Sequence, residues 1–112
     1  EALVNAVEEG GEPGGGIAVA SRLLRQNRPN PFNPRTSIAF EVPEGAGQVQ
    51  LAVFDVDGRH VLDLVDGAMA TGEHTVEWDG RDAQGEALAS GLYYYRLQVD
   101  GHSEVRSMIL LR

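Results

Sequence analysis

The sequence contains no cysteine and no lysine, and aromatic residues make up only 6% of its 112 residues. Without cysteine there are no disulfides, thiolate metal ligands or cysteine nucleophiles. Without lysine all nine cations are arginine, and a formal net charge of −8 argues against binding to nucleic acid. No apolar run approaches the roughly 18 residues that a membrane-spanning helix needs. We therefore expect a small acidic domain, and a first residue of Glu1 rather than Met indicates a processed product or a fragment.

The first 21 residues differ in composition from the rest of the chain. They contain four glutamates and no cation, and residues 8–16 hold five glycines and one proline. We therefore expect a strand-like segment with a glycine-rich linker over 1–21, and a folded domain over 22–112. One interpretation of the apolar start is a strand that adds to the open edge of a neighbouring subunit and builds a homo-oligomer, and the alternative is a linker from an upstream domain. The expected assembly strand comprises Ala2, Leu3, Val4, Asn5, Ala6 and Val7.

Residues 22–35 carry four arginines and no acidic residue. Because this basic block is short and lacks interleaved aromatic residues, we expect solvated or acid-paired guanidinium groups rather than phosphate binding. Pro29, Pro31 and Pro34 remove three main-chain donors and favour extended geometry at the residues before them. The segment is therefore predicted to run along the edge of a sheet as a bent strand, with Phe32 as its anchor in the core.

Beyond Pro34, apolar and polar residues alternate with the period of half-buried strands. Such runs are predicted at 38–42, 49–53, 61–65, 75–78, 92–99 and 103–111. Asp-Gly pairs at 57–58 and 100–101 indicate hairpin turns, and the pair at 66–67 is predicted to end a strand. No segment shows the period of a helix longer than a turn or two. Six or seven short strands predict a β-sandwich, whose expected core comprises Phe40, Leu51, Val53, Val76, Trp78, Tyr95 and Leu97.

The order of the motifs resembles a known family. From about Leu24 to Arg112 the chain reads QNRPNPFNPRTSIAFEVP, VQLAVFDVDGRHV, GEHTVEWDGRDAQGEALASGLYYYRL and a terminal SMILLR. This set resembles the immunoglobulin-like domain of flagellar hook-capping proteins and the C-terminal sorting domain of proteins exported by the type IX secretion system. The resemblance implies an all-β, immunoglobulin-like β-sandwich of about seven strands. Family members usually place lysine near the last strand, where this chain has Arg106 and Arg112.

For function, the resemblance to the secretion group implies a non-catalytic C-terminal sorting and anchoring module that directs an exported protein to the cell surface. Its partners would be proteins of the secretion machinery, and its location would be secreted or on the bacterial cell surface. The expected sorting and recognition residues are Pro29, Asn30, Pro31, Phe32, Met108, Ile109, Leu110, Leu111 and Arg112. The alternative is a structural subunit of an extracellular filament or flagellar-type assembly, whose partners are neighbouring subunits joined through the N-terminal strand.

The residues do not predict an enzyme. Acidic side chains crowd the loop 79–86, but the third, fifth and sixth positions counted from Asp79 do not fit a calcium loop, so Asx turns are expected instead. The three histidines have no spacing that converges ligands, and Ser90 lacks a nucleophile-elbow motif. We therefore expect no catalytic residue, no metal, no cofactor and no small-molecule substrate.

Overall fold

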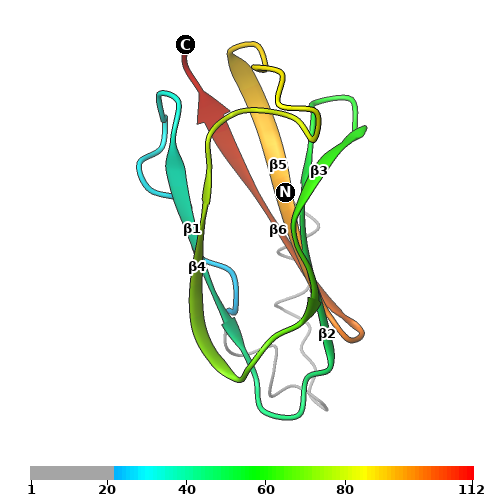
Figure 1. Ribbon diagram of the computed structural model, residues 1–112. Coiled ribbons are helices and arrows are strands. Elements are labelled where there is room, and N and C mark those ends of the chain that lie inside the picture. The colour runs from blue at the N-terminus through cyan, green and yellow to red at the C-terminus, as the bar shows by residue number, and fades with distance from the viewer. Residues whose placement is uncertain (1–21) are drawn as a thin grey trace.

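The computed structural model describes residues 22–112, whose regular elements are six β-strands in two packed antiparallel sheets (Figure 1). One sheet pairs β1 (Thr36–Val42) with β4 (Gly72–Trp78). The other has the order β3-β2-β5-β6, with β2 at Gln48–Phe54, β3 at His60–Ala68, β5 at Gly91–Val99 and β6 at His102–Leu110. The expected linker and the strand Ala2–Val7 lie outside the described residues. Residues 22–112 contain no helix with the length and apolarity that a membrane span requires.

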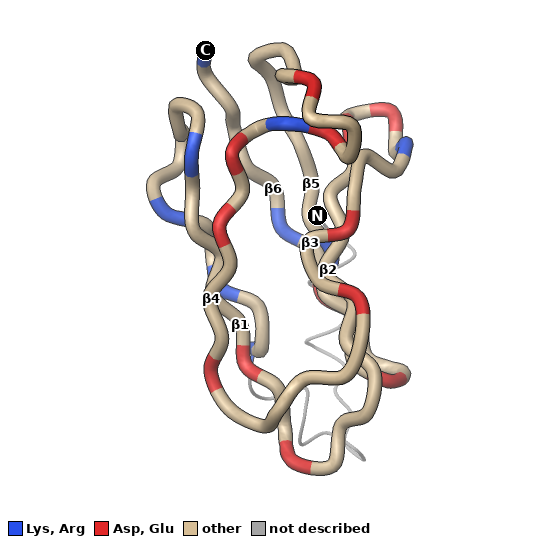
Figure 2. Tube along the Cα trace, in the orientation of Figure 1, with Lys and Arg blue, Asp and Glu red and all other residues tan. Residues whose placement is uncertain are grey.

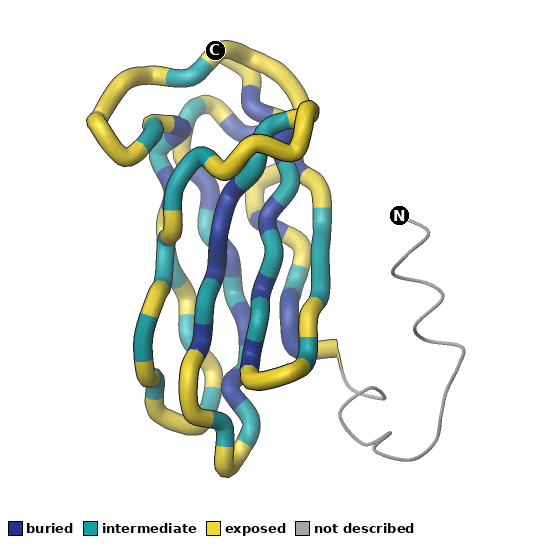
Figure 3. Tube along the Cα trace, turned by 90° about the vertical axis from the view of Figure 1, so that its right-hand side faces the viewer, coloured by how far each residue is buried: buried dark blue, intermediate teal, exposed yellow. Residues whose placement is uncertain are grey.

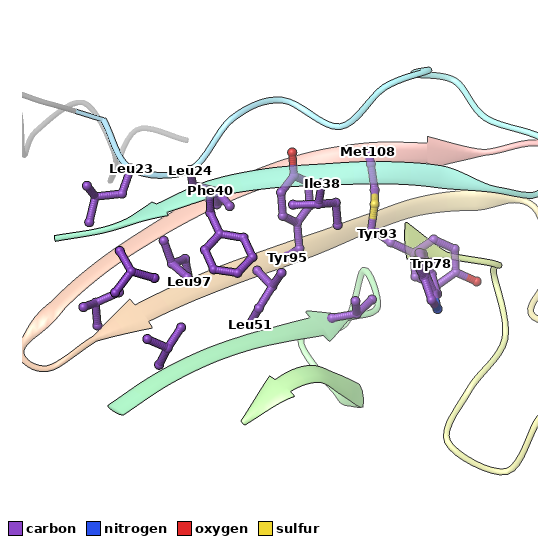
Figure 4. Packing of buried hydrophobic residues seen from close by; sticks show 14 of the residues in the cluster. Leu23, Leu24, Ile38, Phe40, Leu51, Trp78, Tyr93, Tyr95, Leu97 and Met108 are labelled. Atoms are coloured by element: carbon purple, nitrogen blue, oxygen red, sulfur yellow. The ribbon is translucent and has the colours of Figure 1, made fainter. Parts of the chain in front are cut away.

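Side chains that alternate along the strands build one core between the two sheets. Figure 3 shows buried and less buried residues alternating along the strands, and Figure 4 shows how the buried side chains pack. Six of the seven residues predicted for the core are at most 2% exposed. The exception is Val76, which is half-buried because β4 is the outermost strand of its sheet among the described residues.

The Asp-Gly pairs form hairpin turns at both expected places. The pair at 57–58 joins β2 to β3, and the pair at 100–101 joins β5 to β6. At 66–67 the prediction of a strand end is wrong, because β3 continues through this pair opposite residues 49–50 of β2. The hydrogen bonds between strands join main-chain groups and do not depend on the side chains. Asp66 and Gly67 therefore continue β3, because β2 extends far enough to pair with them.

Residues 23–32, which we call the edge segment, stand where a seventh strand was expected. The first half runs antiparallel to β1, where the Arg28 amide donates to the Ser37 carbonyl (2.9 Å) and the Ser37 amide donates to the Arg28 carbonyl (2.8 Å). At Phe32 the segment crosses to the other sheet and pairs in parallel with Leu110 of β6. Its two bridges to β1, at Leu24 and Arg28, differ by one residue in register, and Pro29 and Pro31 follow them, so isolated bridges replace a regular strand. The edge position and the burial of Phe32 (1% exposed) confirm the expectation for this segment.

A buried polar cluster fixes the edge segment to the core. The Tyr95 hydroxyl donates to the Arg25 carbonyl and accepts from the Asn27 amide, both at 2.8 Å. The side-chain amide of Asn27 donates to the Thr36 hydroxyl (3.0 Å), which donates to the Pro29 carbonyl (2.9 Å). Burial raises the pKa of Tyr95 to about 12, so the phenol is neutral at physiological pH. Each member of such a cluster has a partner, and losing one leaves a buried polar group unpaired.

Glu104 of β6 holds the start of the edge segment. Its carboxylate accepts hydrogen bonds from the amides of Leu23 (3.0 Å) and Leu24 (2.8 Å), and His102 Nε2 lies 2.7 Å from it. Burial by itself raises the pKa of Glu104, but the hydrogen bonds from His102 and from the two amides outweigh burial and hold the pKa below its usual value. Arg106 Nε donates to the Leu24 carbonyl (2.7 Å). Side chains of β6 thus bind both main-chain amides and a main-chain carbonyl of this segment.

Tyr95→Phe tests the buried cluster. The substitution leaves the buried Asn27 amide and the Arg25 carbonyl without their shared partner, so we expect the free energy of unfolding to fall by about 1–3 kcal/mol. Urea denaturation followed by the fluorescence of Trp78 measures the change. Tyr94→Phe is the matched control, because the Tyr94 hydroxyl has no hydrogen-bond partner among the described residues. Equal losses in the two variants would contradict the role given to the Tyr95 hydroxyl.

Glu104→Gln tests the contribution of the Glu104 carboxylate to stability. Because the pKa of Glu104 is lower in the folded than in the unfolded protein, the carboxylate stabilises the fold above its usual pKa of about 4.3, and this contribution is lost as the pH falls through the folded-state pKa. We expect the free energy of unfolding of the unmodified protein to fall more steeply between about pH 5 and pH 3 than that of the variant. Denaturation series at several pH values measure both curves, and parallel curves would contradict the lowered pKa.

Candidate functional site

The two motifs expected to carry recognition lie side by side. The Phe32 amide donates to the Ile109 carbonyl (2.9 Å), and the Leu111 amide donates to the Phe32 carbonyl (2.8 Å). The side-chain oxygen of Asn30 accepts a hydrogen bond from the Ile109 amide (2.9 Å). Residues 29–32 and 108–112 therefore form one joint, which we call the seam.

The seam divides its residues into a buried and an exposed group. Phe32, Met108 and Leu110 are at most 1% exposed and belong to the core. Phe32 packs against Trp78, with the ring centroids 5.7 Å apart. The exposed group comprises Pro29, Asn30, Pro31, Ile109, Leu111 and Arg112. A partner protein can touch only the exposed group, whereas the buried group determines where the exposed residues lie.

Large apolar side chains are exposed at the seam. Ile109 is 40% exposed and Leu111 is 48% exposed, and Leu92 (38%) stands directly opposite Ile109 in the β5–β6 register. We call these three residues the apolar patch. Leu92 was not among the expected site residues, although its alternation with the buried Tyr93 places it on the outer face of the sheet. Apolar residues that gather on a surface are typical of a protein contact.

Arg112 holds the loop that lies against this end of the sandwich. Its Nε donates to the Leu88 carbonyl (2.6 Å), its Nη2 donates to the Gly80 carbonyl (2.7 Å), and its amide donates to the Ser90 hydroxyl (2.8 Å). Gly80 has φ +74°, and a Cβ at this position would lie 2.9 Å from Nη2 of Arg112. Glycine therefore suits the left-handed backbone at this position, and a side chain here would displace the guanidinium group. These bonds make Arg112 a positioning residue for the loop.

The acidic loops form turns. Asp55 Oδ1 accepts hydrogen bonds from the amides of Asp57 and Arg59, both at 2.9 Å, and Asp82 Oδ1 does the same for the amides two and four residues further on. The bonds at Asp82 confirm the Asx turns expected in the loop 79–86, and Asp55 forms a turn of the same kind. The hydrogen bond from the Arg59 amide is the main cause of a pKa of Asp55 below its usual value. Within 22–112 no group of three His, Asp or Glu side chains is placed to hold a metal ion.

Two arginines of the basic block pair with acidic side chains of the β1–β4 sheet. Arg25 Nη2 lies 2.9 Å from Glu73 and 3.8 Å from Glu41, and Arg35 lies 3.9 Å from Glu77. Figure 2 shows that this side of the sandwich carries both arginine and acidic positions. For these two residues the expectation of acid-paired guanidinium groups is confirmed. All three pairs are exposed, and such pairs contribute little to stability.

Among known proteins, the chain matches the family model of the FlgD Ig-like domain over residues 27–103. Two curated relatives share 34% identity with it over 58 residues, the basal-body rod modification proteins FlgD of Salmonella typhimurium and Salmonella typhi. The match covers 52% of this chain and 25% of each relative. The chain thus spans about a quarter of the length of these relatives.

Solved structures share the fold at low sequence identity. Dimeric latent PorU from Porphyromonas gingivalis gives a TM-score of 0.65 at 22% identity, over 79% of this chain and 9% of that chain. PorZ, an essential bacterial surface component of the type-IX secretion system of the same organism, gives 0.55 at 23% identity, over 78% and 11%. FlgD from P. aeruginosa gives 0.52 at 24% identity, over 67% and 59%. The resemblance seen in the sequence and the immunoglobulin-like sandwich are confirmed, and the chain belongs to the FlgD Ig-like domain family.

Proposed function

We propose that this domain is a non-catalytic module that directs an exported protein to the bacterial cell surface and anchors it there. In this proposal the exposed residues of the seam, together with the apolar patch, are the recognition surface. The partners are proteins of the secretion machinery, and the protein that carries the domain is secreted or held at the cell surface.

The seam is the observation that carries the proposal. It joins motifs from opposite ends of the domain, and it forms only when the edge segment crosses from β1 to β6. A partner that binds the seam therefore binds the folded domain and not an extended peptide. Such dependence on folding suits a module that directs a protein to export, because the recognition surface exists only in the folded sandwich.

The chemistry of the seam supports a protein partner. Leu92, Ile109 and Leu111 are 38% to 48% exposed, and exposed apolar groups of this size lose contact with water when a partner covers them. A formal net charge of −8 disfavours polyanionic partners, since the field of the whole chain repels them. A protein surface with its own apolar pocket fits both properties.

The similar structures support the cellular setting. PorZ is described as a bacterial surface component of the type-IX secretion system, and it shares the fold of this chain over 78% of the chain. That description belongs to PorZ, and a shared fold does not by itself transfer a function. The support for this chain lies in the combination of the family, the exposed seam and the apolar patch.

Replacing two of the three residues of the apolar patch tests the proposal. Residues 1–112 are fused to the C-terminus of a passenger protein in a bacterium that carries a type IX secretion system, and passenger on the cell surface is measured. We expect the fusion to reach the surface, and Ile109→Ser combined with Leu111→Ser to lower the amount by roughly tenfold or more, because exposed anchors of an interface each contribute about 1 kcal/mol or more. Deleting 108–112 is less informative, since it also removes the buried Met108 and Leu110.

The matched control is Val56→Ser, which removes a side chain that is 63% exposed in the β2–β3 turn, outside the seam. Circular dichroism and urea denaturation of each purified variant verify that the sandwich is intact. Export of the folded double variant at the level of the unmodified fusion would contradict the proposed surface. Equal loss in the Val56→Ser variant would show that export responds to surface changes of any kind, which also contradicts it.

A further inference from the structure

The sandwich has a closed side and an open side. On the closed side the edge segment bonds to both β1 and β6. On the open side β4 and β3 are the outermost strands of their sheets, and no described residue pairs with their outer edges (Figure 1). An outer strand presents unpaired N–H and C=O groups, which form a template for pairing with another strand.

The unpaired groups of β4 follow from the register. Residues 37, 39 and 41 of β1 bond to the edge segment, so the residues between them direct their main-chain groups toward β4. Their partners on β4 are Gly72, His74, Val76 and Trp78. The alternate residues Glu73, Thr75 and Glu77 therefore direct their N–H and C=O groups away from β1. Each of these three residues can exchange two hydrogen bonds with an added antiparallel strand.

β4 is a more regular edge than β3. β4 pairs with β1 over its whole length without a register shift, and it contains no proline. The pairing of β3 with β2 is shifted twice, between Leu51 and Ala52 and between Val53 and Phe54. Irregularities of this kind bend a strand and protect an edge against further pairing. An incoming strand therefore finds an even ladder only on β4.

The open side also leaves part of the core incompletely covered. Val76 of β4 and Leu62, Leu64 and Val65 of β3 pack on the core but are half-buried. By contrast, the inward side chains at the centre of β2 and β5 are fully buried. A further strand on β4 would shield these side chains from water, and each Å² of apolar surface removed contributes about 25 cal/mol.

Acidic side chains on β4 do not prevent a further strand from pairing with this edge. Glu73 and Glu77 are exposed on the outer face, opposite to the side of Val76. Arg25 lies 2.9 Å from Glu73, and Arg35 lies 3.9 Å from Glu77. Figure 2 shows the acidic positions along β4. A strand without acidic residues meets little repulsion here, because like charges directly opposite each other are what destabilises a pair.

We propose that the β4 edge binds residues Ala2–Val7 of a second copy of this chain by β-strand addition. This proposal does not rest on the sorting function. The six residues of this segment carry no charge, and five of them are apolar. Their number approaches the seven residues of β4, so one segment can span the edge. Main-chain pairing then supplies the affinity, and the half-buried side chains select an apolar strand.

A second copy reaches this edge more directly than the same chain. The described domain begins at Arg22, beside the edge segment, and the edge segment and β4 flank opposite sides of β1. A neighbouring copy can approach β4 from solvent, on the side of β1 that lies away from the edge segment. Every copy carries both the donor strand and the acceptor edge. Such a contact repeats head to tail and builds a row of subunits.

Proline substitutions test the contact from both sides. Thr75→Pro removes an N–H that points away from β1, and proline is tolerated at such positions of an edge strand. Val4→Pro removes an N–H of the added strand. Sedimentation velocity of the full chain over a range of concentrations measures the assembly. We expect oligomers that grow with concentration, monomers for each proline variant, and a species of two chains when the two variants are mixed. The controls are Thr75→Val and Val4→Thr, which keep the N–H and should assemble like the unmodified chain.

Each other outcome overturns the proposal. A full chain that is monomeric at its highest soluble concentration would show that no second copy binds. Oligomers that persist in both proline variants would place the contact elsewhere. A monomer that loses stability in the Val4→Pro variant would show that the chain's own segment occupies the edge. Circular dichroism of Thr75→Pro verifies that the sandwich is folded, and if this variant unfolds, Val4→Pro by itself decides between assembly and monomer.

Discussion

The hydroxyl group of Tyr95 reaches from β5 to the edge segment and bonds to two main-chain groups there, the Arg25 carbonyl and the Asn27 amide. The edge segment contains prolines, so it cannot be held by a continuous ladder of main-chain bonds. Side chains of the core and of β6 supply the missing bonds. The two sheets are joined on one side because this phenol, and with it the Asn27 and Glu104 side chains, fix the path of an irregular segment.

The seam follows from that path. Phe32 reaches β6 only because the segment before it is held against β1, and its two hydrogen bonds then position Ile109 and Leu111. The residues that face solvent at the seam are thus positioned by residues that face the core. The same arrangement makes the two sides of the sandwich different. Among residues 22–112, the edge segment pairs with β1 and β6 on one side, and no segment pairs with the outer edges of β3 and β4 on the other. One side of the domain offers side chains for recognition, and the other offers main-chain groups.

Most of the fold could be predicted from alternation. Phe40, Leu51 and Leu97 alternate with polar neighbours, so their burial follows from the period of a strand. Val76 has the same pattern and is only half-buried, because burial also depends on what lies beyond the strand. The pair at 66–67 has the chemistry of a turn, yet it lies within β3, because the length of β2 opposite it decides where the ladder ends. Leu92 could have been found from its alternation with Tyr93, but exposure alone does not mark a site.

The sequence by itself determined the class of fold, the hairpins at 57–58 and 100–101, the edge position of the proline-rich segment and the family resemblance. These features depend on local properties: the period of side chains, the φ restriction of proline and the tolerance of Asp-Gly for turns. Only the tertiary structure decided that residues 29–32 contact 108–112, that Met108 and Leu110 are buried while Ile109 and Leu111 are exposed, and that β4 is left as an even edge. The physical reason is that pairing between strands far apart in the chain depends on how the sheets pack as a whole, which no local pattern contains.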